Sequence, residues 1–194
     1  MPVVQVMSDL HLELHRDGGR NFIESQDSTG VDVLVLAGDI LSAKFSKPVE
    51  ETFQMFADKF PRVLYVPGNH EFWGTKPEET INLLTKVTAK FSNVMLLADR
   101  TVTIGKTRFL GGPMWFPQWG PLEDYAASQM PDFQLIEGFR AWSVKANQRF
   151  NTFLSEYLRE GDVVITHYLP QRRASLQGSN DRPSTRSSFA RWRL

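Results

Sequence analysis

The chain has 194 residues, 41% of them hydrophobic and 23% charged, with a formal net charge of zero. This composition is typical of a globular domain large enough to bury a core without cross-links. The absence of cysteine excludes disulfide scaffolds, zinc fingers and iron–sulfur proteins, so any metal must be bound through oxygen or nitrogen. Neither a signal peptide nor an apolar run of the ~18 residues that span a membrane is found, so we expect a cytoplasmic protein without a membrane partner.

Short apolar runs recur along the chain, and each is followed by polar residues. They cover residues 2–7, 33–37 and 62–66, and a fourth run, 162–166, ends at His167. Nearly continuous apolar runs of this length are typical of parallel strands that are covered on both faces. We therefore predict four strands whose carboxyl ends carry polar side chains.

Helical periodicity separates these strands, over residues 48–60, 78–91 and 144–160. Gly161 follows the last helix at the position where a glycine commonly ends a helix. The polar segment 15–30 is expected to be a long loop over one end of the sheet.

The middle of the chain contains three short runs at 94–98, 101–104 and 107–110, separated by two-residue breaks. Breaks of that length predict antiparallel strands. Without an internal repeat or a long linker, the chain is expected to form one domain over 1–170, with a basic, Ser/Arg-rich remnant of the same domain over 171–194.

The segment 171–194 carries a charge of +5, which leaves −5 on the remainder of the chain. A basic tail could contact nucleic acid. Its serines and Pro183 equally favour an irregular chain end. Both interpretations stay open at this stage.

Polar groups of one chemical kind follow the four predicted strands. The candidate site residues are Asp9, His11, Asp39, Asn69, His70 and His167. Because ligands of open α/β sheets bind beyond the carboxyl ends of the strands, these side chains are expected to converge. Their oxygen and nitrogen donors suit Mn, Fe, Zn or Ni, and a carboxylate such as Asp39 can span two ions. Each residue alone could be an ordinary turn or cap residue, but their joint occurrence favours a hydrolytic metal site.

The motifs Asp-x-His, Gly-Asp, Gly-Asn-His-Glu and Thr-His, in this order, resemble those of the calcineurin-like metallophosphoesterase superfamily, especially its small bacterial and phage members. Residues 112–115 and 130–136 also resemble the middle of those proteins. The resemblance implies an α/β fold with two packed mixed β-sheets flanked by α-helices, a four-layer sandwich. It also implies metal-dependent hydrolysis of a small phosphomonoester or phosphodiester substrate.

The same resemblance implies a role for each candidate residue. The ligands of one or two divalent ions would be Asp9 and His11 for the first, Asp39 between both, and Asn69 and His167 for the second. A metal-bound hydroxide would attack phosphorus, and the catalytic residue His70 would protonate the leaving group or stabilise the charged transition state. A histidine beside such a centre can donate a proton near neutral pH.

Other residues are given mainly structural interpretations. Glu71 is expected to set the geometry of its loop, and His15 to be a solvated loop residue. Four aromatic residues could line a substrate cleft or belong to the core: Trp73, Trp115, Phe116 and Trp119.

The family pattern ends with Gly-His-x-His, whereas no histidine follows His167 in this chain. We therefore expect a C-terminally truncated domain or a diverged tail, with weakened binding of the second ion. An uncovered sheet edge would favour a homodimer. The alternative to an enzyme is a catalytically weakened or inactive truncated homologue that acts as a binding module.

Overall fold

The structure, a computed structural model, describes residues 1–115, 123–169 and 190–192. Two sheets lie face to face, the first with strand order β4-β3-β2-β1-β8 and the second with order β5-β6-β7. The strands are β1 (Val4–Met7), β2 (Val33–Ala37), β3 (Val63–Val66), β4 (Val94–Leu96), β5 (Arg100–Ile104), β6 (Thr107–Gly111), β7 (Val163–Ile165) and β8 (Ala190–Trp192). The helices are η1 (Leu12–Leu14), α1 (Arg20–Glu24), α2 (Ser46–Lys59), η2 (His70–Phe72), α3 (Pro77–Thr88), α4 (Glu123–Gln129), α5 (Asp132–Leu135) and α6 (Phe139–Tyr157).

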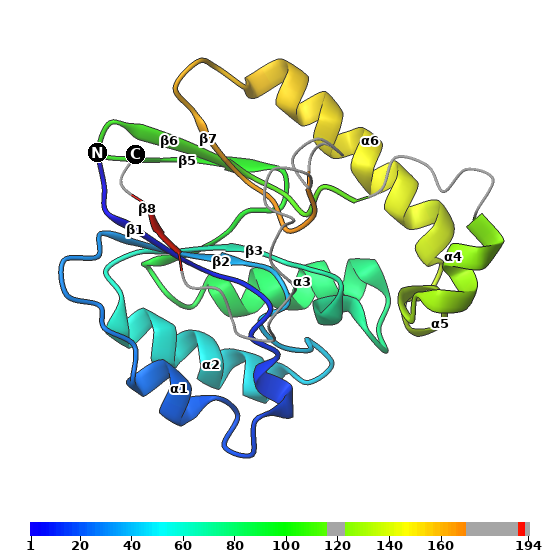
Figure 1. The fold of residues 1–194 in the computed structure, drawn as a ribbon, viewed down its shortest axis with the longest axis horizontal. Coiled ribbons are helices and arrows are strands. Elements are labelled where there is room, and N and C mark those ends of the chain that lie inside the picture. The colour runs from blue at the N-terminus through cyan, green and yellow to red at the C-terminus, as the bar shows by residue number, and fades with distance from the viewer. Residues whose placement is uncertain (116–122, 170–189, 193–194) are drawn as a thin grey trace, which may run out of the picture.

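The elements form four layers. Helices α1, α2 and α3 cover one face of the first sheet, the second sheet lies on its other face, and α6 lies outside the second sheet (Figure 1). Both sheets are mixed, because β8 runs antiparallel to β1 in the first and β6 runs parallel to β7 in the second. The predicted sandwich of two mixed sheets flanked by helices is therefore confirmed.

Strand β2 illustrates why the apolar runs are nearly continuous. Leu34 and Leu36 belong to the core beneath α2, where they join Phe53. The alternate residues Val33 and Val35 belong to the core between the sheets. Because successive side chains of a strand point to opposite faces, a strand buried on both faces needs apolar residues at every position.

Strands β1, β2, β3 and β4 are mutually parallel. Met7 of β1 is in register with Leu36 of β2, and Ala37 is in register with Val66 of β3. The segments that follow these three strands therefore leave the same edge of the sheet. In the second sheet β7 ends nearby, since His167, two residues after it, places its Nδ1 2.9 Å from the carbonyl of Ala37 in β2.

The expected antiparallel middle is correct only in part. The run 94–98 contributes β4, which pairs in parallel with β3 in the first sheet. The reason is that α3 forms a crossover between them, and a crossover returns the chain in the same direction. Strands β5 and β6 form the predicted antiparallel hairpin of the second sheet.

Two local predictions are also corrected. Helix α6 begins at Phe139 rather than at residue 144 and ends at Tyr157. Gly161, with φ of 83°, therefore lies in the turn before β7 and not at the end of the helix. The segment 15–30 is not all loop, because it contains α1, whose Ile23 is buried.

The tail 171–194 lies outside the described residues except for β8. Phe116 and Trp119 likewise fall outside them. Within the described ranges, no helix is both long and apolar enough to cross a membrane.

Candidate metal centre

The loop after β1 runs alongside the loop after β2. The amide of Asp9 donates to the carbonyl of Gly38, and the amide of His11 donates to the carbonyl of Asp39, each at 3.0 Å. Asp9, His11 and Asp39 all adopt positive φ angles, between 46° and 55°. This conformation costs about 1–2 kcal/mol for a residue with a side chain. Three such residues side by side indicate a functional constraint on their placement.

The carboxylate of Asp39 occupies the middle of the site, and the residue is 4% exposed. Its Oδ2 lies 4.0 Å from His11 Nε2, and its Oδ1 lies 3.6 Å from His167 Nε2. Oδ1 also accepts a hydrogen bond from the amide of His70 at 2.9 Å. Asp39 therefore faces histidines that follow strands of two different sheets.

His167 and Asn69 present lone pairs to each other. His167 Nδ1 lies 2.9 Å from the carbonyl of Ala37, an acceptor, so in the neutral imidazole Nδ1 carries the proton and Nε2 presents a lone pair. Asn69 donates from Nδ2 to Asp132 at 2.8 Å, which leaves its Oδ1 facing His167 Nε2 at 3.2 Å. Two acceptors at this distance repel each other unless they share a proton or bind the same cation.

The residues therefore fit a bound divalent cation. Asp9, His11 and Asp39 each offer one ligand atom, and these atoms lie within 4.8 Å of one another. His167 and Asn69 add a nitrogen and an oxygen beside Asp39. Such a donor set suits Mn, Fe, Zn or Ni. The structure thus brings together all five predicted ligands.

Glu71 holds the loops that carry these ligands. Its fully buried carboxylate accepts hydrogen bonds from the amides of Asp39 (3.1 Å), Ile40 (2.8 Å) and Gly68 (2.8 Å). Burial, together with the charge of Asp39, raises the pKa of Glu71 to about 7. The prediction that Glu71 sets loop geometry is confirmed.

His70 lies beside the candidate ligands and is partly buried. Its ring packs on Trp73 at a centroid distance of 3.5 Å and meets the His11 ring edge-on at 4.2 Å. Burial by itself lowers the pKa of His70, but the interaction with Glu13 and the charge of Asp39 outweigh it, so this pKa lies above its usual value. The predicted catalytic residue is therefore next to the candidate ligands.

Sequence reasoning missed two acidic residues of the site. Asp132, which is 3% exposed, accepts hydrogen bonds from Asn69 Nδ2 and from Trp73 Nε1 at 2.8 and 2.7 Å. Glu13 contacts His70 and lies two positions after His11, which is the only local signal for it. The only signal for Asp132 was that it lies in the stretch 130–136, which resembles the middle of the family's proteins but implied no role at the site.

The remaining predicted residues divide between site and scaffold. Trp73 belongs to the site, whereas Trp115 is 1% exposed and lies in a core cluster with Phe72 and Phe139. His15 is exposed, as expected for a loop residue.

Gly68 leaves no room for a side chain beside the candidate ligands. A Cβ atom there would lie 2.2 Å from Asp39 Oδ1 and 2.9 Å from His167 Cε1. We expect Gly68→Ala to displace both side chains and to weaken Mn²⁺ binding by about tenfold or more, measured by calorimetry. Gly105→Ala, in the β5–β6 turn, strains a backbone with φ of 60° but has no atom within 4 Å of its Cβ, so it is the control for a glycine replacement away from the ligands. Equal Mn²⁺ affinities in the two variants would show that Mn²⁺ binding does not require a residue without a side chain at position 68.

A family comparison agrees with this fold. The family model of the calcineurin-like phosphoesterases matches residues 3–184. The chain therefore belongs to the calcineurin-like phosphoesterase family, a class of metal-dependent hydrolases of phosphate esters.

Individual relatives extend the comparison. The uncharacterized protein L509 of Acanthamoeba polyphaga mimivirus is 26% identical, and the match covers 88% of this chain and 69% of the viral protein. The phosphopantetheinyl hydrolase PptH of Mycobacterium tuberculosis superposes with a TM-score of 0.70 at 18% identity, covering 89% of this chain and 70% of that one. TT1561 of Thermus thermophilus superposes with a TM-score of 0.57 at 17% identity, covering 95% of this chain and 73% of that one. At these identities the two solved structures establish the fold alone.

Proposed function

We propose that this chain hydrolyses phosphate esters with one or two divalent metal ions bound at the candidate centre. The ions would be held by Asp9, His11, Asp39, Asn69 and His167. The observation that carries the proposal is the pair of acceptors on Asn69 and His167, which face each other at 3.2 Å beside the Asp39 carboxylate. When bound, a divalent ion supplies Lewis acidity toward the phosphate and activates water for attack.

His70 is proposed to act on the leaving group. Its imidazole is held between Trp73 and His11, so its ring has a defined orientation beside the ligands. The raised pKa of His70 favours the protonated imidazole, which can give a proton to a departing alkoxide. It can equally stabilise the negative charge that develops on the ester oxygen.

The proposed substrate is a small phosphate ester. PptH, which shares the fold, is a phosphopantetheinyl hydrolase, so an ester of that kind belongs in the substrate panel. The identity of 18% does not select it over others. The panel therefore includes both a monoester and a diester.

The direct test is turnover of p-nitrophenyl phosphate and of its bis ester with Mn²⁺, Fe²⁺, Zn²⁺ or Ni²⁺ added to metal-stripped protein. We expect metal-dependent release of p-nitrophenol, with kcat in His70→Ala lower by about 10²- to 10⁴-fold. His15→Ala, which changes an exposed histidine, should match the unaltered protein. If no metal supports turnover of any ester in the panel, the hydrolase proposal is wrong and the binding-module alternative is favoured.

A further inference from the structure

We infer that Glu13 is a positioning residue that orients two histidines of the site at once, one a proposed metal ligand and the other the proposed proton donor. The inference rests on the proposed function, which assigns the roles of metal ligand and proton donor to these two histidines. The contacts themselves are independent of it. Glu13 belongs to η1, directly after His11 in the loop that follows β1.

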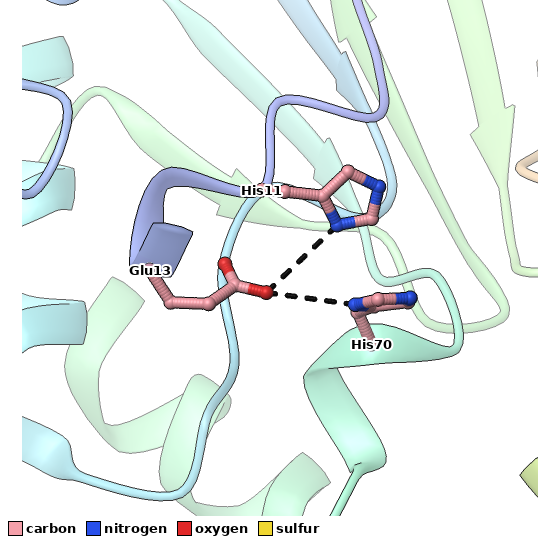
Figure 2. A group of neighbouring side chains, drawn as sticks. All are labelled: His11, Glu13 and His70. Atoms are coloured by element: carbon pink, nitrogen blue, oxygen red, sulfur yellow. Dashed lines mark ion pairs between the residues drawn. The ribbon is translucent and has the colours of Figure 1, made fainter. Parts of the chain in front are cut away.

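One carboxylate oxygen faces both imidazoles. Glu13 Oε1 lies 3.5 Å from His70 Nδ1 and 3.8 Å from His11 Nδ1 (Figure 2). The two rings approach from different loops, one after β1 and one after β3. The Glu13 carboxylate is therefore placed to accept a hydrogen bond from Nδ1 of each ring.

The contact between Glu13 and His11 Nδ1 matters for metal binding because Nε2, the other ring nitrogen of His11, is the proposed metal-binding atom. His11 Nε2 faces Asp39, whereas His11 Nδ1 is buried and has no hydrogen-bond partner among the described residues. A histidine that binds a metal through one nitrogen ordinarily donates its other N–H to a carboxylate, carbonyl or water. Glu13 is the carboxylate within reach of that nitrogen, and a small approach would satisfy it.

For His70 the same contact selects the reacting nitrogen. In the protonated ring, the Nδ1–H held toward Glu13 leaves the Nε2–H for the substrate, and the neutral ring that remains after proton transfer is the Nδ1–H tautomer. Rotation of the ring is restricted by Trp73 on one side and by His11 on the other. Glu13 thus fixes the one remaining variable, the tautomer.

The placement of Glu13 is itself supported by the fold. Leu12, the preceding residue, is 1% exposed, and its amide donates to the carbonyl of Ile40 at 2.9 Å. The Glu13 side chain is only 26% exposed. Glu13 as a residue is exposed, but its buried neighbour and the lower exposure of its side chain distinguish it from a surface acid such as Glu24, whose side chain is 62% exposed.

The kinetic test compares Glu13→Ala and Glu13→Gln with the control Glu24→Gln. We expect kcat in Glu13→Ala to fall by about 10- to 100-fold while KM changes less than about threefold. Phenyl phosphate should lose more rate than p-nitrophenyl phosphate, because its poorer leaving group depends more on proton donation. Glu13→Gln keeps the shape of the side chain and one acceptor oxygen, so its kcat should lie between those of Glu13→Ala and the unaltered protein. Equal losses on both esters would overturn the role through His70.

Two further measurements need no turnover. In metal-free protein at a pH where the histidines are neutral, ¹⁵N NMR should show His11 and His70 protonated at Nδ1, and Glu13→Ala should shift both toward the Nε2–H tautomer. Unchanged tautomers would overturn the inference. Calorimetry with Mn²⁺ should give the same stoichiometry in Glu13→Gln, and loss of an ion would make Glu13 a ligand instead. If the unaltered protein hydrolyses no ester, the proposed function fails, whereas the tautomer result still decides the positioning role.

Discussion

Asp39→Asn is expected to abolish high-affinity Mn²⁺ binding and to lower phosphate-ester hydrolysis by at least about 1,000-fold, or roughly 4 kcal/mol of transition-state stabilisation. The substitution keeps the size of the side chain but removes the charge at the middle of the site. Asp39 is the group that faces both His11 and His167. Losing its charge therefore weakens both halves of the proposed centre.

Calorimetry and initial rates measure this effect separately. Asp58→Asn is the matched control, because Asp58 is an exposed residue of α2 that accepts a hydrogen bond from Gln54. The Asp58→Asn variant should bind Mn²⁺ and hydrolyse substrate like the unaltered protein. Retention of Mn²⁺ affinity within a factor of about three in Asp39→Asn would contradict the bridging position.

Glu71→Ala is expected to lower the free energy of unfolding by about 3 kcal/mol or more. The reason is that three buried amides, those of Asp39, Ile40 and Gly68, would lose their acceptor, and each unsatisfied buried group costs about 1–3 kcal/mol. Because these amides belong to the loops after β2 and β3, Mn²⁺ affinity should fall with stability. Urea denaturation measures the first effect and calorimetry the second.

The control for Glu71 is Glu50→Ala. Glu50 pairs with Lys90 on the surface and its side chain is 42% exposed, so its loss should change stability by less than about 1 kcal/mol. If Glu71→Ala were no more destabilised than Glu50→Ala, the amides would have to find water or other acceptors. In that case Glu71 would not organise the loops.

Much of this arrangement was predictable because its chemistry is local to strand ends. An apolar run such as 33–37 identifies a doubly covered strand, and the Asp39 that follows it emerges at the carboxyl edge. Parallel strands then bring residues from distant loops to the same edge without any knowledge of tertiary contacts. The six candidate residues could be grouped on that ground alone.

The features that escaped prediction depend on contacts between remote segments. Asp132 reaches the site only because α5 packs beside η2, where it accepts hydrogen bonds from Asn69 and Trp73. The direction of β4 was set by its pairing with β3 after the α3 crossover, and a two-residue break cannot reveal that partner. Glu13 illustrates an intermediate case, since its neighbour His11 was evident but its contact with His70 is 57 positions away along the chain.

The most direct measurement is an anomalous-difference map from a crystal of the protein grown with Mn²⁺. We predict at least one Mn²⁺ peak within coordination distance of an Asp39 carboxylate oxygen, with His11 or His167 as a further ligand. A well-diffracting crystal in which Mn²⁺ is bound only elsewhere, with Asn69 and His167 still facing each other at hydrogen-bond distance, would contradict the metal centre proposed for this chain.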